Sequence, residues 1–171
     1  MKNRTSGSTL KKVAVLLLDR TVIKGYLSPA LLGRSETIDV LTPDGEHLPV
    51  KLAEVKSVYF VREFTEAFEP ERKVFLSRPK LNGLWVRLRF QDEDTIEGIV
   101  SNDLLDLLDA GVHLTPPDLN GNNLRMYIPR SALSEMKVLG VVGAARRVPR
   151  AGRKAGDARK PQPTQPTLFD E

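Results

Sequence analysis

The chain has 171 residues and a formal net charge of +4, with no cysteine and two histidines. Disulfide and thiolate chemistry is therefore excluded, and His47 and His113 cannot form a metal site without further ligands. The early apolar run at residues 13–18 is too short for a signal-peptide core or a membrane span. We expect a cytoplasmic protein that binds no metal or cofactor.

The basic residues are concentrated at the two ends of the chain. Residues 1–12 carry four basic side chains, and residues 146–171 carry seven basic and three acidic ones. These ends together have a charge of +8, which leaves −4 for the remaining residues. A negative body repels phosphate on average, so attraction to nucleic acid or an acidic partner is expected only from the C-terminal basic residues. These are Arg146, Arg147, Arg150, Arg153, Lys154, Arg159 and Lys160.

An internal repeat relates the two halves of the chain. The alternating apolar pattern of residues 13–27 recurs 73 positions later, at residues 86–100, without a gap. The match resumes at residues 41–43 and 114–116, which both read Leu-Thr-Pro, with the same spacing. Alternation with a period of two places one set of side chains on one face of a strand. The repeat therefore predicts a small β domain that has been duplicated.

Each copy carries a glycine in its second predicted strand, Gly25 in the first half and Gly98 in the second. Glycine weakens the interior of a strand, and it is favoured where the strand bends sharply or where another backbone passes close. We therefore predict that the two glycines have the same structural role in their halves.

The first half is predicted to form five strands, at residues 12–18, 22–27, 37–41, 47–52 and 57–61. Pro29 and Gly33 interrupt the pattern and indicate a loop with one helical turn. Asp44 and Gly45 are typical of a two-residue hairpin turn, because this pair tolerates the positive φ that such turns require.

The second half repeats this plan, with strands expected at residues 84–91, 95–100, 112–115, 124–128 and 135–142. Residues 101–111 favour a helix, because Ser101 can cap it and four leucines supply an apolar face. These leucines are Leu104, Leu105, Leu107 and Leu108.

Five short strands in each half predict a mainly β fold of two tandem five-stranded small barrels with short helical turns, because closure removes exposed sheet edges. The predicted domains are a disordered lead at residues 1–11, a first barrel at 12–64, a linker at 65–83, a second barrel at 84–143 and a disordered basic tail at 144–171.

Residues 18–27, which read Leu-Asp-Arg-Thr-Val-Ile-Lys-Gly-Tyr-Leu, resemble the first signature of Sm-like barrels, and residues 90–100 resemble it too. SH3-like barrels share this pattern. The chain through Val142 is similar to an uncharacterised bacterial family with two tandem barrels of this type. The resemblance implies small barrels that can pair edge to edge.

The RNA-binding residues of Sm-like proteins are not found at the matching positions. Those proteins carry an Asp-x-x-Met/aromatic-Asn run and an Arg-Gly or Lys-Gly pair, whereas residues 28–32 read Ser-Pro-Ala-Leu-Leu and residues 101–105 read Ser-Asn-Asp-Leu-Leu. Stacking and base-edge contacts supply the specificity of RNA recognition. An Sm-like nucleic-acid-binding, regulatory role is therefore kept only as the alternative function.

The carboxylates cluster in predicted turns and links, at residues 63–71, 92–94 and 103–109. Such runs are typical of solvated surfaces. A general base or nucleophile instead needs a partner within hydrogen-bond reach and a pocket that shifts its pKa. We therefore expect that the protein is not an enzyme.

The tail ends in a short apolar motif after the run Pro-Gln-Pro-Thr-Gln-Pro-Thr at residues 161–167. Gln165, Leu168 and Phe169 resemble the Gln-x-x-Leu-Phe peptide with which bacterial replication and repair proteins dock on the sliding clamp. The resemblance implies that Leu168 and Phe169 fill an apolar pocket while the Gln165 amide fixes the register. The position of Gln165 can also follow from the tandem Gln-Pro-Thr repeat, and the terminal Leu-Phe pair can fold back onto the barrels.

These patterns predict a non-catalytic adaptor whose basic tail ends in a hydrophobic docking peptide of the sliding-clamp type, associated with DNA. The expected partners are a protein at the C-terminal peptide and non-specific nucleic acid at the basic tail, with no membrane contact. The chain is expected to be a monomer or an edge-paired homo-oligomer.

Overall fold

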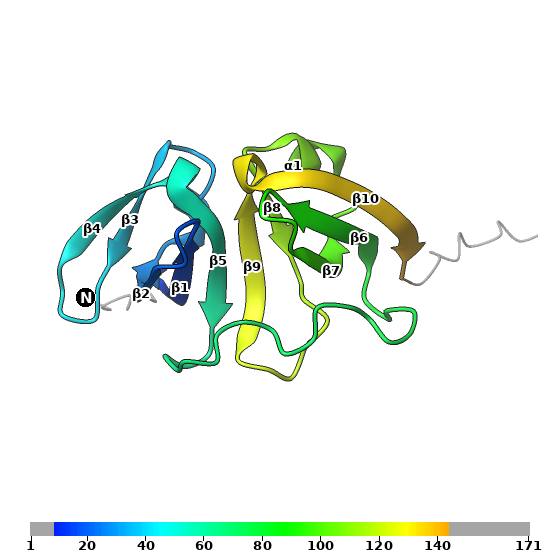
Figure 1. The fold of residues 1–171 in the computed structure, drawn as a ribbon, viewed down its shortest axis with the longest axis horizontal. Helices are drawn as coiled ribbons and strands as arrows, with labels where there is room; N and C mark the ends of the chain where they lie inside the picture. Colours follow the sequence, from blue (N-terminus) through cyan, green and yellow to red (C-terminus); the bar gives the residue numbers. More distant parts are fainter. Residues whose placement is uncertain (1–8, 144–171) are drawn as a thin grey trace, which may run out of the picture.

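The computed structural model describes residues 9–143 (Figure 1). This part of the chain is mainly β, as the sequence predicts. The strands of the first half are β1 (Lys11–Leu17), β2 (Val22–Leu27), β3 (Thr37–Leu41), β4 (His47–Lys51) and β5 (Val55–Val61). Those of the second half are β6 (Gly83–Phe90), β7 (Thr95–Val100), β8 (Gly111–Leu114), β9 (Asn123–Pro129) and β10 (Leu133–Val142). The helical elements are α1 (Leu104–Leu108) and the 3-10 turns η1 (Pro29–Leu31), η2 (Leu52–Glu54) and η3 (Arg130–Ala132).

The strands pair antiparallel in two sheets, one of seven strands in the order β4-β3-β2-β1-β5-β9-β8 and one of three in the order β10-β6-β7. An isolated bridge between Ile99 and Thr115 links β7 to the end of β8. The two halves therefore share one strand order. It runs β4-β3-β2-β1-β5 in the first half and β9-β8-β7-β6-β10 in the second.

Neither sheet closes on itself, so the predicted closure into two small barrels is wrong. Closure of the first half would require β5 to pair with β4, but the second edge of β5 is occupied by β9 of the other half. Figure 1 shows β5 and β9 side by side at the centre of the molecule. The predicted domains at residues 12–64 and 84–143 consequently contribute strands to one common sheet.

Each half completes the hydrophobic core of the other. Leu16 on β1 and Tyr59 and Val61 on β5 belong to the core of the second half. In return, Tyr127 on β9 packs in the core of the first half, where it lies opposite Val58. A unit of about 60 residues buries too little surface to be very stable alone. The exchange of core residues compensates for the small size of the two halves.

Gly25 and Gly98 lie where the third strand of each half passes closest to the second. A Cβ atom at Gly25 would lie 2.5 Å from the carbonyl oxygen of Leu41 and 2.7 Å from Cγ1 of Val40. A Cβ atom at Gly98 would lie 2.3 Å from Cδ1 of Leu114. Neither glycine has a positive φ. Close packing, rather than an unusual backbone conformation, therefore requires glycine at both positions.

The structural register of the third strands differs by one residue from the sequence match. Tyr26 pairs with Leu41, and its counterpart Ile99 pairs with Thr115. These partners are 74 positions apart, whereas the Leu-Thr-Pro runs match at 73. The segment between the second and third strands is therefore one residue longer in the second half, where α1 has formed.

Helix α1 is shorter than the helix predicted at residues 101–111. Asp103, rather than Ser101, is its N-cap, because the Asp103 carboxylate accepts a hydrogen bond from the N–H of Leu105 at 2.9 Å. Only Leu107 of its four leucines packs against the core. Within residues 9–143 no helix has the length and apolar character needed to span a membrane.

Candidate interaction surface

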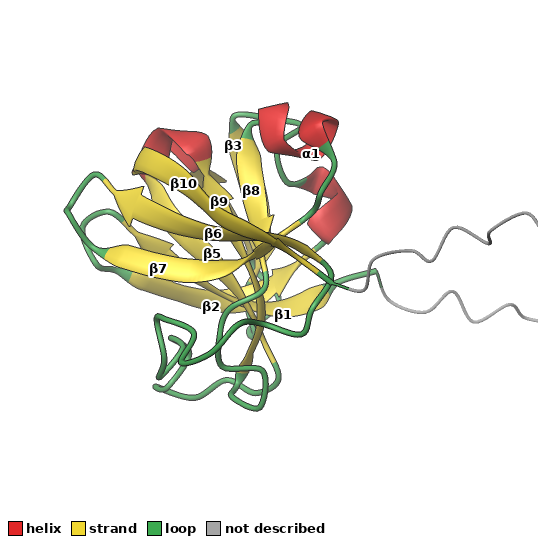
Figure 2. Ribbon diagram, turned by 90° about the vertical axis from the view of Figure 1, so that its right-hand side faces the viewer, coloured by secondary structure: helices red, strands yellow, loops and turns green. Residues whose placement is uncertain are grey.

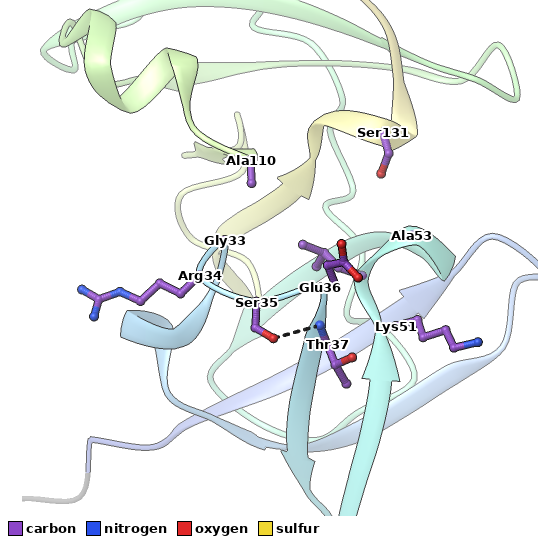
Figure 3. Close-up of a pocket in the computed structure, with 10 residues that line it drawn as sticks. Gly33, Arg34, Ser35, Glu36, Thr37, Lys51, Ala53, Ala110 and Ser131 are labelled. Atoms are coloured by element: carbon purple, nitrogen blue, oxygen red, sulfur yellow. Dashed lines mark hydrogen bonds between the residues drawn. The ribbon is translucent and has the colours of Figure 1, made fainter.

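A cleft of about 690 Å³ lies between the two halves (Figure 3). The helical elements gather at one end of the molecule (Figure 2). Its lining comes from Gly33, Arg34, Ser35, Glu36, Thr37, Lys51, Leu52 and Ala53 of the first half and from Ala110 and Ser131 of the second. In Figure 3 the side chains of Arg34 and Lys51 extend in opposite directions. The Ser35 hydroxyl accepts a hydrogen bond from the Thr37 N–H at 3.3 Å and so serves the local turn. The polar side chains drawn in Figure 3 do not converge on one point of the cleft.

Three leucines of α1, next to this cleft in sequence, project into solvent. The exposed fractions of Leu104, Leu105 and Leu108 are 71%, 77% and 74%. Single exposed apolar residues are ordinary on protein surfaces, but contiguous apolar patches mark interaction sites. We call these three side chains the leucine ridge.

The leucine ridge is fixed to the scaffold at its C-terminal end and is bordered by carboxylates. The Arg130 guanidinium, at the end of β9, donates hydrogen bonds to the carbonyl oxygens of Leu107 and, at 3.1 Å, of Asp109. Asp103, Asp106 and Asp109 alternate with the leucines along the sequence. The ridge is therefore an apolar surface with an acidic border.

The ridge was not predicted from the sequence, because the four leucines were expected only to supply the apolar face of a helix at residues 101–111. The composition does carry a signal, since residues 104–108 read Leu-Leu-Asp-Leu-Leu. One face of a helix this short cannot bury four leucines. The excess apolar residues must therefore remain in solvent or meet a partner.

A buried cation joins the two halves away from the ridge. Lys56 on β5 is buried, and its Nζ lies 2.6 Å from Asp92 Oδ2 and 3.4 Å from Asp94 Oδ2 in the turn between β6 and β7. The same Nζ lies 4.8 Å from the centre of the Phe90 ring. The hydrogen bond from Lys56 lowers the pKa of Asp92. This paired group ties the two halves together.

A second buried group anchors the link between the halves, residues 62–82. Glu97 accepts hydrogen bonds from the Phe75 N–H and Trp85 Nε1, both at 3.1 Å, and from Arg87 Nε and Nη2 at 3.2 and 2.7 Å. Burial acts to raise the pKa of Glu97, but the hydrogen bonds from Arg87, Phe75 and Trp85 outweigh it, so that the pKa is lowered. A carboxylate that accepts hydrogen bonds in this way is held in its charged form.

The two histidines lie in different parts of the fold. His47 Nδ1 lies 2.6 Å from Asp39 Oδ2 on the exposed β3–β4 hairpin. His113 on β8 packs its ring 5.0 Å from that of Tyr127, and burial lowers the pKa of His113. Among residues 9–143, no three histidine or acidic side chains are grouped to hold a metal ion.

The docking and charge residues predicted from the C-terminal sequence lie outside residues 9–143, so their roles stay predictions. They are Gln165, Leu168, Phe169, Arg146, Arg147, Arg150, Arg153, Lys154, Arg159 and Lys160. Gly25 and Gly98 occupy equivalent places in β2 and β7 and line neither the cleft nor the leucine ridge.

Comparison with known proteins places the chain in a family without assigning an activity. The chain matches no curated protein and no solved structure. Residues 9–140 match a family described as "Family of unknown function (DUF6982)". This match covers nearly the whole described part of the chain, and the protein therefore belongs to this family of unknown function.

Proposed function

We propose that the protein is a non-catalytic adaptor that binds protein partners through the leucine ridge of α1 and through its C-terminal peptide. The observation that carries the proposal is the exposure of Leu104, Leu105 and Leu108 on a helix that is held in place by Arg130. Complete burial of one leucine contributes about 1.5–3 kcal/mol. Three such side chains can support micromolar binding after ordering costs are deducted.

The acidic border of the ridge favours one kind of partner. Asp103, Asp106 and Asp109 would lie at the rim of the contact, where complementary charge speeds association and excludes wrong partners. The partner surface should therefore be an apolar groove with lysine or arginine at its rim.

The C-terminal peptide would provide a second contact. In this proposal Leu168 and Phe169 fill an apolar pocket of a sliding clamp and Gln165 sets the register. A basic tail adds salt-sensitive attraction to DNA near such a partner. Two weak contacts on one chain strengthen binding through effective concentration when both can be engaged at once. The shared strand order of the two halves supports the interpretation of each half as an open relative of the Sm-like barrel.

Affinity purification with the full chain tests the ridge. We expect Leu105→Ser/Leu108→Ser to lose the proteins that co-purify with the native chain, with no loss of fold, because both side chains lie in solvent. Leu76→Ser is the matched control, since Leu76 is 79% exposed in the link between the halves. Identical partner recovery with the ridge variant and the control would remove the ridge from the proposal.

Binding to a purified bacterial sliding clamp tests the tail. We expect the full chain to bind and Leu168→Ala/Phe169→Ala to bind at least tenfold more weakly. Equal binding by the two proteins, or none by the native chain, would refute the clamp contact.

The alternative is an Sm-like nucleic-acid binder that works through its β scaffold. A full-length variant distinguishes this alternative from the adaptor. In this variant glutamine replaces the seven basic residues between Arg146 and Lys160, and the measurement is oligonucleotide binding. We expect this variant to lose binding, because residues 13–145 carry a net charge of −4. Undiminished binding would favour the scaffold as the nucleic-acid site.

A further inference from the structure

Strands β5 and β10 are the same strand of the repeat in very different surroundings. Val58 on β5 pairs with Val15, and Met136 on β10 pairs with Leu88, the counterpart of Val15 73 positions later. Strand β5 is buried at every position from Val55 to Val61, whereas residues 134–139 of β10 are all exposed. The difference arises because β5 has a neighbour on both edges, β1 and β9, while within residues 9–143 β10 pairs only with β6.

The open edge of β10 is apolar. Met136, Val138, Leu139 and Val141 are 37%, 55%, 37% and 61% exposed. A long edge strand of this kind offers unpaired backbone groups to another chain, and proteins usually protect such edges with proline, charge or cover. In the first half the same edge is covered by an antiparallel strand, β9. The repeat itself therefore indicates that an antiparallel strand fits this edge.

The hydrogen-bond alternation shows which residues of β10 face outward. The Phe90 N–H bonds to the Asp94 carbonyl on the β7 side, so Arg87 and Arg89 direct their backbone groups to β10, opposite Lys137 and Glu135. The backbone groups of Met136 and Val138 consequently face the open edge. Ser134 lies at a register shift of the β10–β6 ladder, where its hydroxyl donates to the carbonyl oxygens of Arg89 and Phe90. Beyond Val138, Arg78 Nη2 donates to the Val141 carbonyl at 2.6 Å and caps the end of the edge.

The other outer edge of the molecule, β4, is blocked. The bonds from the Thr42 N–H to the Glu46 carbonyl and from the Leu52 N–H to the Glu36 carbonyl set the alternation of the β3–β4 ladder. In this alternation Pro49 faces the free edge, where it has no N–H to donate. Its counterpart in the second half is Tyr127, which likewise lies three residues before a 3-10 turn and pairs with β5. Growth of the sheet from β10 of one copy to β4 of the next is therefore disfavoured.

We propose that β10 pairs antiparallel with β10 of a second copy of this chain, about a twofold axis at Met136. The two Met136 residues would lie opposite each other, and Ser134 would lie opposite Val138 of the second copy. Glu135 would lie opposite Lys137 of the second copy, so that the symmetric pair of strands contains two opposite-charge contacts. Met136 faces outward in both copies, so the hydrogen-bond ladder is consistent with itself at the axis. This twofold contact uses the β10 edge of both copies, so the assembly closes as a dimer and the sheet does not grow further.

Charge reversal in the full chain tests this register, with solution mass as the measurement. Glu135→Lys places two lysines opposite each other at both contacts, and Lys137→Glu places two glutamates there. We expect each single variant to weaken the dimer about tenfold. An equimolar mixture of the two variants restores both opposite-charge contacts and should form a heterodimer. Lys137 and Glu135 also form an ion pair within one chain, at 3.0 Å. If the charges acted only through this internal pair, mixing the two variants would restore nothing.

A single introduced cysteine tests the axis independently, because the native chain has none. Residues opposite each other in a hydrogen-bonded antiparallel pair have Cα atoms about 5.5 Å apart, within the range of a disulfide. We expect Met136→Cys to form a covalent dimer rapidly on oxidation, and Leu105→Cys, on the leucine ridge, to do so slowly. A native chain that stays monomeric at all accessible concentrations, an open-ended series of larger assemblies, or a dimer unaffected by both charge reversals would overturn the proposal.

Discussion

Val58 and Met136 hold the same position in the two halves, yet Val58 is fully buried and Met136 is 37% exposed. The contrast comes from the neighbours, because Tyr127 of the other half lies opposite Val58 in the β5–β9 ladder. The two halves are joined head to tail, because β5 of the first pairs with β9 of the second. Such an arrangement leaves the outer edges of the counterparts of these two strands unpaired at the ends of the strand order. Among residues 9–143 those edges are β4, which Pro49 protects, and β10, which has no strand on its second side.

The face of the sheet that is buried in one half has become polar in the other. Leu16 and Tyr59 enter the core of the second half, whereas their counterparts Arg89 and Lys137 are exposed. Arg89 pairs with Glu93, and Lys137 pairs with Glu135. This face is therefore polar in the half where no further strand or core of residues 9–143 covers it.

Tyr127 provides a direct test of how the halves depend on each other. Its hydroxyl oxygen is buried without a hydrogen-bond partner among the described residues, and burial raises the pKa of Tyr127 to about 12. Removing an unsatisfied hydroxyl costs nothing, so Tyr127→Phe should unfold in urea at the native midpoint or above it. Tyr127→Ala should lose about 3–5 kcal/mol, because it empties a site between the two cores. Equal damage from both substitutions would show that the hydroxyl is bonded after all.

Alternation and turn chemistry predicted the strands of both halves closely, because most of the strands bury one or both faces. The pairing of β5 with β9 was not predictable in this way. Local patterns show that β5 is apolar on both faces, but they do not identify the strand that covers its second edge. The leucine ridge was missed for a related reason, since a leucine in solvent and a leucine in a core look alike in sequence. The exposure of the ridge therefore depends on tertiary contacts, which only the structure supplies.

The glycines of the second strands should differ in their tolerance of a methyl group. Gly25→Ala brings Cβ against the Leu41 carbonyl oxygen, which is backbone and cannot move away, so we expect a loss of about 2–3 kcal/mol. Gly98→Ala meets Cδ1 and Cγ of the buried Leu114 side chain, which can change its rotamer where a backbone carbonyl cannot, and should cost about 1–2 kcal/mol. Gly140→Ala is the control, because nothing lies within 4 Å of its added Cβ. The free energy of unfolding measured in urea checks this order, and a reversed order of Gly25 and Gly98 would contradict it.

The ion pairs between the halves predict a loss of stability in acid. The pKa of Asp92 is lowered by its hydrogen bond from Lys56, and the pKa of Asp94 is lowered because Lys73 and Lys56 outweigh the effect of its burial. A carboxyl whose pKa is lowered on folding stabilises the folded state when the pH is above its pKa in the unfolded chain, here 3.8. This stabilisation is lost as the pH falls through the lower pKa of the folded state. The native thermal midpoint should therefore drop steeply below about pH 4.

Removing these carboxylates should flatten that acid dependence. We expect Asp92→Asn/Asp94→Asn to be less stable than the native protein at pH 7, because Lys56 is left buried without a counterion. The difference between the two proteins should shrink as the pH falls below 4. Asp44→Asn, in the exposed β3–β4 turn, is the control and should follow the native curve. Parallel curves for the native protein and the double variant would argue against the assigned ion pairs.

Glu97 should control the order of the link between the halves. Glu97→Gln replaces one acceptor oxygen with an NH₂ group that faces the donors of Phe75 and Trp85, so we expect a loss of about 3 kcal/mol. The chain contains one tryptophan, and its emission should therefore shift to longer wavelength as Trp85 loses this contact and gains water. Proteolysis within residues 72–81 should become faster, because the Lys73 carbonyl also bonds to the Glu97 N–H, at 2.7 Å, in the same anchor. Glu46→Gln, on the exposed β3–β4 hairpin, is the control that should change neither signal. If Glu97→Gln leaves both the emission and the cleavage rate at native values, the link is held by other contacts and the anchor assigned to Glu97 is wrong.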